Sequence, residues 1–293
     1  GYHGWHDWYL SANISSKSNL DDQLMKGLDS KGVPRSLSKT ALPFNMEDID
    51  HFEKLINKHQ KKLAAIIIEP CRSDYPSKEL LMSIQSICRK YGIILIFDEI
   101  TSGFRLFPGG AHLLHKEIEP DIAVFAKSTS NGYPFAAIIG SKKIMESASE
   151  TFISSTNWTE RIGTVAAKAT IEKYIKYNVH KKIIRTGDNL KNIWRKIGDK
   201  HSLDIQVSGL PSLPSFSFNN KDNSLIMSYY TARMLDFNIL GFRQFKPSFS
   251  HNNLHLKEYE KATDIIFEEI GLEKYKNVGL VPQLSFFQRL AKE

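Results

Sequence analysis

In the first half of the chain, short apolar runs alternate with segments whose apolar residues have the spacing of a helix. The runs predict strands that are buried on both faces. They occupy residues 64–69, 93–98, 121–126 and 135–140. Apolar side chains at i, i+3 and i+4 predict helices over residues 46–63 and 77–91, the second with Ser77 as its N-cap and Gly92 as its C-terminal stop. This alternation is typical of an α/β fold with a mostly parallel central sheet and flanking helices.

The pattern changes in the second half of the chain. Long helices are predicted over residues 161–177 and 181–200, and shorter strands and helices follow them. These shorter elements cover residues 205–208, 215–218, 224–235 and 256–270. We therefore expect a large α/β domain over residues 1–177 and a smaller C-terminal α+β domain over residues 178–293.

Composition and charge narrow the class of protein. The chain of 293 residues is 41% hydrophobic and carries 39 Lys and Arg against 32 Asp and Glu, a net charge of +7. This content suffices for a buried core and excludes disorder over most of the chain. The basic residues are dispersed and accompany no nucleic-acid-binding motif, so we expect a solvated basic surface and no nucleic-acid partner.

Several absences predict a cytoplasmic protein. The two cysteines, Cys71 and Cys88, form no CxxC motif and indicate neither a disulfide scaffold nor a zinc site. No apolar run approaches the roughly 20 residues of a membrane span, and residues 1–7 (GYHGWHD) lack the apolar segment of a signal peptide. No further ligands accompany His3 and His6, so we expect no metal.

Three charged residues close the first three predicted strands, namely Glu69, Asp98 and Lys127. In a parallel sheet the carboxyl ends of the strands face the ligand crevice, and a buried charge there is costly without a partner. The structural alternatives are an ion pair of Asp98 with Arg105 or a helix N-cap, a lysine that extends its amine to solvent, and a turn carboxylate at Glu69.

The aspartate and the lysine together suit pyridoxal phosphate. A carboxylate on the pyridine nitrogen keeps that ring cationic, and a lysine holds the aldehyde as a Schiff base. Burial at a strand end lowers the pKa of a lysine and makes its amine nucleophilic. We therefore interpret Lys127 and Asp98 as catalytic residues and pyridoxal phosphate as the cofactor.

Four motifs carry a family resemblance. They are YHGWHD at residues 2–7, IIIEP at 66–70, LIFDEITSGFR at 95–105 and AK at 126–127. In order and spacing they resemble class III aminotransferases, a family of fold-type-I pyridoxal phosphate enzymes, and within it the glutamate-1-semialdehyde 2,1-aminomutase-like branch. The resemblance is strong over residues 1–171 and looser after them.

The resemblance implies a role for each cofactor-binding residue. Tyr2 would stack on one face of the cofactor ring and Ile100 would pack on the other. Asp98 would pair with the ring nitrogen, Glu69 would support the site from the preceding strand, and Lys127 would form the Schiff base.

Thr156 resembles the threonine that reaches the cofactor phosphate of the neighbouring subunit, which implies a homodimer with shared active sites. The family's usual Asn-Pro after this threonine is replaced by residues 158–161 (WTER), and Thr159 is a competing candidate. A polar helix cap is the structural alternative for this segment.

Two features depart from the family's pattern. The family's phosphate-binding loop lies upstream of the Tyr-His-Gly motif, so we expect the chain to be N-terminally truncated and to lack that loop. Residues 128–134 (STSNGYP) replace a glycine-richer loop and resemble a branch associated with surface-polysaccharide or amino-sugar pathways.

The expected activity is amino transfer between an amine donor and a carbonyl acceptor. Intramolecular transfer, as in glutamate-1-semialdehyde 2,1-aminomutase, uses the same residues and stays open. A non-catalytic truncated homologue that retains the dimer surface is an alternative of another class. Arg233, Arg243 and His251 are candidates for holding a substrate carboxylate, against the alternative that each is surface charge.

Overall fold

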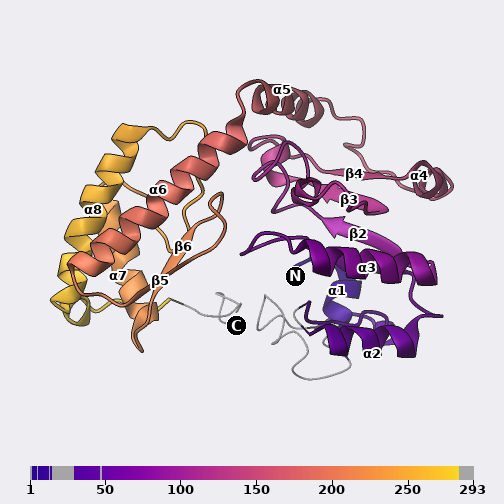
Figure 1. Cartoon of the computed structure of the whole chain (residues 1–293), viewed down its shortest axis with the longest axis horizontal. Coiled ribbons are helices and arrows are strands. Elements are labelled where there is room, and N and C mark those ends of the chain that lie inside the picture. The colour runs from indigo at the N-terminus through magenta and orange to yellow at the C-terminus, as the bar shows by residue number, and fades with distance from the viewer. Residues whose placement is uncertain (1, 5, 13, 15–29, 47, 284–293) are drawn as a thin grey trace.

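The computed structural model describes residues 2–4, 6–12, 14, 30–46 and 48–283 (Figure 1). Its larger sheet has the strand order β1–β2–β3–β4. The strands are β1 (Ala65–Ile68), β2 (Ile94–Asp98), β3 (Ile122–Phe125) and β4 (Ala137–Gly140). The first three are parallel and β4 is antiparallel to β3. The α/β fold with a mostly parallel sheet is therefore confirmed.

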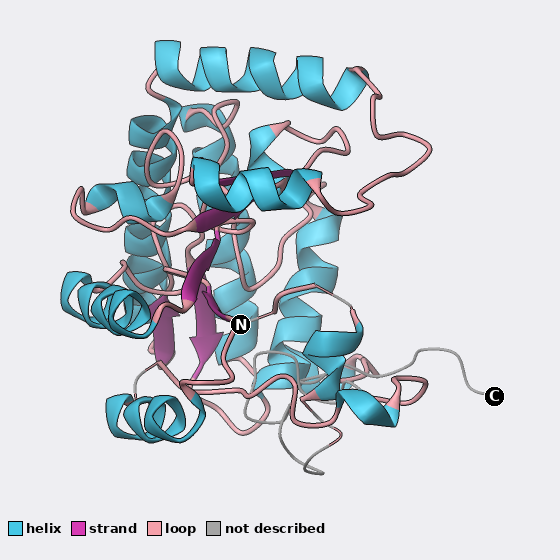
Figure 2. Ribbon diagram, turned by 90° about the vertical axis from the view of Figure 1, so that its right-hand side faces the viewer, coloured by secondary structure: helices cyan, strands magenta, loops and turns pink. Residues whose placement is uncertain are grey.

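Helices surround this sheet and make up much of the rest of the chain (Figure 2). The α-helices are α1 (Asp7–Ser11), α2 (Ile49–His59), α3 (Lys78–Tyr91), α4 (Lys142–Ser149), α5 (Ile162–Lys176), α6 (Val179–Lys200), α7 (Asn223–Asp236) and α8 (Asn253–Gly271). The 3-10 turns are η1 (Arg35–Leu37), η2 (Ala111–Leu114), η3 (Lys127–Thr129) and η4 (Lys274–Asn277). None of the described helices is long and apolar enough to cross a lipid bilayer.

Helix α3 begins and ends where its sequence predicts. The Ser77 hydroxyl accepts a hydrogen bond from the backbone N–H of Leu80, and so satisfies one of the free donors of the first turn. Gly92 adopts the left-handed conformation (φ +67°) just past the last helical residue. One face of the helix buries Leu81 and Ile84 against β2 and the neighbouring core.

Strand β4 differs from the prediction of a buried strand. Its two isoleucines are exposed, Ile138 by 61% and Ile139 by 54%. Because adjacent side chains of a strand point to opposite faces, both faces of β4 are open in the described part of the chain. The strand pairs there only with β3, so its apolar sequence is not matched by burial.

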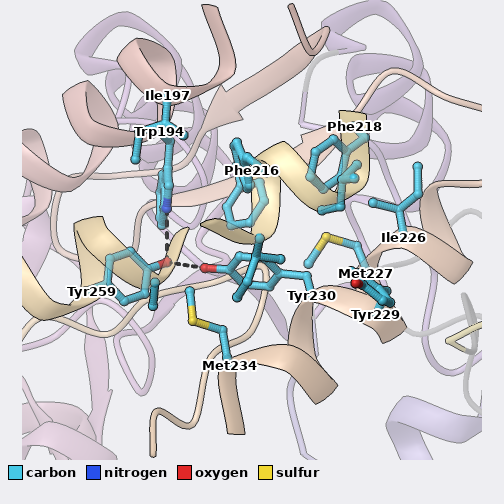
Figure 3. Close-up of a cluster of buried hydrophobic side chains, with 14 of the residues drawn as sticks. Trp194, Ile197, Phe216, Phe218, Ile226, Met227, Tyr229, Tyr230, Met234 and Tyr259 are labelled. Atoms are coloured by element: carbon cyan, nitrogen blue, oxygen red, sulfur yellow. Dashed lines mark hydrogen bonds between the residues drawn. The ribbon is translucent and has the colours of Figure 1, made fainter. Parts of the chain in front are cut away.

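A second core lies among α6, α7, α8 and a small antiparallel sheet of β5 (Ile205–Ser208) and β6 (Ser215–Phe218). Buried aromatic rings fill it (Figure 3). The indole N–H of Trp194 donates to the Tyr259 hydroxyl at 3.0 Å, and that hydroxyl lies 2.8 Å from the Tyr230 hydroxyl. Buried polar atoms require such partners, and this network provides them inside an otherwise apolar core.

The two cores occupy opposite sides of the molecule in Figure 1, and α5, at the top of that view, leads into α6, which belongs to the second core. The first core is built from β1, β2, α2 and α3, and contains Phe97 and Leu95 directly before Asp98. Tight packing of these residues fixes the end of β2. The carboxyl ends of β2 and β3 lie next to each other, since Asp98 is in register with Val124.

Candidate active site

Asp98 ends β2 as a buried carboxylate, 3% exposed. One oxygen, Oδ2, lies 2.9 Å from Nδ1 of His3, and Oδ1 accepts the backbone N–H of Ile100 at 3.0 Å. A carboxylate oxygen accepts, so Nδ1 of His3 carries the proton of this bond. The partner of Asp98 is therefore a residue of the Tyr-His-Gly motif. The alternative ion pair with Arg105 is wrong.

Glu99, the next residue, is fully buried and anchors the loop that follows β2. Its carboxylate accepts from the Ser102 hydroxyl, from the backbone N–H groups of Ala111 (2.9 Å) and His112 (3.1 Å), and from Nδ1 of His112 (2.7 Å). Four donors satisfy this buried charge, as burial requires. Gly110 is needed beside it, because a Cβ there would lie 2.7 Å from Glu99 Oε1.

Lys127 directly follows the residue after β3 and begins the turn η3. Its backbone is left-handed (φ +49°), a conformation that costs a non-glycine residue about 1–2 kcal/mol and clusters at functional sites. Nζ donates to the hydroxyl of Thr101 at 2.8 Å. The lysine is therefore bonded to a neutral partner in the loop that follows β2.

The pKa of Lys127 is held below its ordinary value. Burial is the main cause, although part of the residue stays exposed, and the positive charge of Arg72 is the next. Arg105 lowers the pKa further, while Glu69 and Asp98 act in the opposite sense. The sequence predicts a lowered pKa for a lysine at this strand end, and the pKa of Lys127 is shifted in that direction.

Glu69, which follows β1, is paired with Arg72. One guanidinium nitrogen, Nη1, donates to both carboxylate oxygens at 2.7 and 2.9 Å. The glutamate side chain is 7% exposed and the arginine side chain is 40% exposed. The pair brings a cation close enough to act on Lys127, which the sequence pattern did not single out.

Tyr2 and Ile100 lie beside Asp98 in different ways. Ile100 donates its backbone N–H to the carboxylate, and Tyr2 precedes the histidine that bonds the other oxygen. The Tyr2 ring packs edge-on against Tyr9, with 5.5 Å between centroids. Five of the six candidate residues therefore come from segments that meet at the ends of β1, β2 and β3.

Thr156 is the exception. It is exposed in the loop between α4 and α5, and no hydrogen bond joins it to the other five candidates within the described ranges. Its loop exposes large apolar side chains, with Phe152 97% and Trp158 65% exposed. A threonine that acts in a neighbouring subunit would be found outside the crevice of its own chain.

The residues proposed for a substrate carboxylate have other roles or lie elsewhere. Arg233 donates to Glu269 at 2.8 and 2.9 Å and also pairs with Asp236, so its guanidinium belongs to a helix–helix contact. Arg243 is exposed beside the ring of Phe242. The cations near Lys127 are instead Arg72 and Arg105.

Sequence reasoning missed four residues that interact with Asp98 or Lys127, and two of them had a signal. His3 stands in the same motif as Tyr2, and Arg72 follows the Glu-Pro motif at a spacing that suits an ion pair. Thr101 and Arg105 lie inside the motif at residues 95–105. The Arg105 guanidinium donates through Nε to the Thr101 carbonyl at 2.7 Å, so Thr101 holds both the lysine and the arginine.

Comparisons with known proteins agree with this geometry. A model of the family described as aminotransferase class-III matches residues 1–235. The chain is 29% identical over 242 residues to 3-aminobutyryl-CoA aminotransferase of Cloacimonas acidaminovorans, covering 79% of this chain and 54% of that protein. It is 30% identical to glutamate-1-semialdehyde 2,1-aminomutase of Methanocaldococcus jannaschii, covering 80% and 54%. The chain thus spans about half the length of these relatives.

Solved structures show the same fold. The PLP-containing FumI protein of Sphingopyxis sp. MTA144 superposes with a TM-score of 0.80 at 20% identity, covering 95% of this chain and 64% of that one. A transaminase with PLP bound superposes with a TM-score of 0.76 at 21% identity, covering 93% and 66%. With its motifs, its strand-end residues and the matched family model, the chain belongs to the class III aminotransferases, which use pyridoxal phosphate.

Proposed function

We propose that this chain carries the reactive lysine of an aminotransferase that moves an amino group from an amine donor to a carbonyl acceptor. One observation supports this most: Lys127 and Asp98 follow neighbouring parallel strands, and each is held by a different partner. A lysine free of any carboxylate bond, beside a buried carboxylate, is the pairing that this chemistry needs.

The donor set fits pyridoxal phosphate. Asp98 accepts one hydrogen bond at each oxygen, and a carboxylate oxygen has room for a second donor. Asp98 would therefore hold the ring nitrogen, with Tyr2 and Ile100 on the two faces of the ring. When bound, the cofactor supplies an aldehyde that reacts with amines and a ring that withdraws electrons.

Lys127 would hold the aldehyde carbon and then move the proton. Its lowered pKa increases the fraction of free amine near neutral pH, which is the form that attacks a carbonyl and accepts a proton. The Thr101 hydroxyl orients Nζ from the β2 loop. Glu69 would act through Arg72, whose charge lowers the pKa of the lysine.

We propose in addition that the protein is a homodimer in which Thr156 reaches the partner's cofactor phosphate. The support is the exposed apolar surface around that threonine, on both sides of the α4–α5 loop. Its members are Phe152, Ile153, Trp158, Ile162 and Val165, each more than half exposed. Sedimentation of wild type and Trp158→Glu would test this, since a charge at the centre of the surface should favour the monomer.

The organisation proposed for the chain is two domains, residues 1–177 and 178–293, in the cytoplasm. Two separate hydrophobic cores support the boundary. Two buried free cysteines, Cys71 and Cys88, are consistent with a reducing compartment.

Intramolecular transfer is the second candidate, because a 30%-identical relative is named as an aminomutase. Donor dependence separates the two reactions. An aminotransferase needs a second amino compound as donor, whereas an aminomutase converts its substrate alone.

The proposed site is tested by visible absorbance of the purified protein with added pyridoxal phosphate. Wild type should develop a band that Lys127→Ala lacks. The matched control is Lys143→Ala, which removes an exposed lysine of α4 and should keep the band. No band in any of the three proteins would refute the proposal, as would an equal band in Lys127→Ala.

A further inference from the structure

A cleft of about 490 Å³ lies between the first turns of α6 and the segment that leads into α8. Its size falls in the range of small-molecule sites in proteins, roughly 300–1,000 Å³. All the residues that line it except Leu256 are polar or aromatic. The lining residues are Tyr177, Asn178, Lys181, Lys182, Arg185, Thr186, Asn189, Phe249, His251, Asn252, Asn253 and Leu256.

The charge of this cleft has one sign. Lys181, Lys182 and Arg185 contribute three cations, and no aspartate or glutamate lines the cleft. The Lys182 ammonium donates one hydrogen bond to the backbone carbonyl of Phe249. No ion pair within the described ranges involves Lys181 or Arg185, whereas Lys196, Lys200 and Arg233 have acidic partners.

The backbone adds to the positive potential. Asn178, the N-cap of α6, is left-handed and its side chain makes no capping bond, and the first turns of α6 and α8 contain no acidic residue. Helix N-termini carry partial positive charge, and cations near them are unfavourable for stability. Lys181 and Lys182 in the first turn of α6 therefore oppose folding, with Arg185 one turn further on, and a bound anion would remove the conflict.

The remaining walls offer a neutral donor and two rings. The backbone N–H of Ser248 donates to Nδ1 of His251, so the neutral ring carries its proton on Nε2. Burial, followed by the charges of His255 and Lys182, holds the pKa of His251 below its usual value, which favours the neutral form. The rings of Tyr177 and Phe249 lie 5.8 Å apart at 30° and give a planar ligand an aromatic flank.

We propose that the cleft binds a small organic phosphate, with its phosphate among Lys181, Lys182 and Arg185 and a planar group beside Tyr177. Arginine and lysine side chains with helix N-termini are the usual phosphate ligands of proteins. A carboxylate carries one negative charge and would neutralise only one of the three cations, whereas a phosphate carries more charge. This site is separate from the Lys127 crevice and does not depend on the proposed reaction.

Calorimetric titration with inorganic pyrophosphate and with adenosine diphosphate tests the site. Arg185→Gln should weaken pyrophosphate binding about tenfold, the loss expected for one charged hydrogen bond. Arg195→Gln is the matched control, because this arginine is exposed on the same helix outside the cleft, and it should stay within twofold of wild type. Equal weakening in both variants, or no binding by wild type, would overturn the proposal.

Two further variants locate the ligand. Lys127→Ala should bind pyrophosphate as wild type does, and a tenfold loss there would assign the anion to the Lys127 crevice instead. Tyr177→Ala should weaken adenosine diphosphate about fivefold and leave pyrophosphate within twofold. If adenosine diphosphate binds no more tightly than pyrophosphate, the aromatic half of the proposal fails.

Discussion

Replacing Glu99 with glutamine should destabilise the loop that follows Asp98 and contains Thr101. The carboxylate is fully buried and each oxygen accepts two donors, a backbone N–H and a side-chain group. Glutamine keeps the shape but places an NH₂ group where one oxygen stood. Whichever way the amide turns, that group faces the backbone N–H of Ala111 or of His112, and one buried donor loses its acceptor.

The magnitude follows from these contacts. One unsatisfied buried N–H costs about 1–3 kcal/mol. The remaining hydrogen bonds weaken because they are no longer charge-assisted, while a neutral amide is easier to bury than a carboxylate. Together these two effects cost about 1 kcal/mol. We therefore expect Glu99→Gln to lower the free energy of unfolding by about 2–4 kcal/mol.

Urea unfolding followed by far-UV circular dichroism measures this loss, and amide hydrogen exchange locates it. Either Ala111 or His112 should lose protection while the amides of β2 keep theirs relative to the global stability. The control is Glu119→Gln, since this side chain is 76% exposed and lies 3.5 Å from Arg89; its cost should not exceed about 0.5 kcal/mol. A midpoint shift for Glu99→Gln no larger than that of the control would refute the reasoning.

Two more predictions follow from single contacts. Arg72→Gln removes the positive charge that lowers the pKa of Lys127 most, so this pKa should rise towards its ordinary value. Competitive acetylation of Lys127, read by mass spectrometry, should have its midpoint at higher pH in Arg72→Gln and at an unchanged pH in Arg72→Lys. An unmoved midpoint in Arg72→Gln would contradict the role of Arg72. Tyr259→Phe leaves the Trp194 indole N–H and the Tyr230 hydroxyl without their shared partner, and should cost about 2–4 kcal/mol in urea unfolding. Tyr230→Phe removes only the end of that chain and should cost about 0.5–1.5 kcal/mol, so an equal or larger cost for this variant would argue against the network.

Local pattern predicted the elements of the fold well. Continuous apolar runs predicted the parallel strands correctly, because a strand covered on both faces needs apolar side chains at every position, although Ile67 of β1 is 39% exposed. Ser77 and Gly92 marked the ends of α3 because capping chemistry is local to the sequence. The prediction that β4 is buried was wrong for a different reason. An apolar sequence indicates that a strand is able to be buried, whereas its burial depends on the neighbours that cover it.

The candidate site was predictable only in part. Charged residues at strand ends identified Asp98 and Lys127, since a lone charge after an apolar run stands out. The bonds that position them join residues far apart in the chain: His3 with Asp98, and Thr101 with Lys127. Such contacts follow from tertiary packing and leave no periodic trace in the sequence.

The partition of charge around Lys127 explains how the pKa of this lysine stays below its ordinary value. Two carboxylates act on this lysine, and either would raise its pKa and hold it as an ammonium ion if it were free to form an ion pair. Asp98 is instead bonded to His3 and to a backbone N–H, and Glu69 is bonded at both oxygens by Arg72. Among the residues that the structure describes, the neutral Thr101 hydroxyl is the hydrogen-bond partner left for the amine. Arg72 thus acts twice, because it occupies the carboxylate that would neutralise the effect of burial and adds a repelling charge of its own. Both effects favour the free amine, and both are lost together when this one side chain is removed.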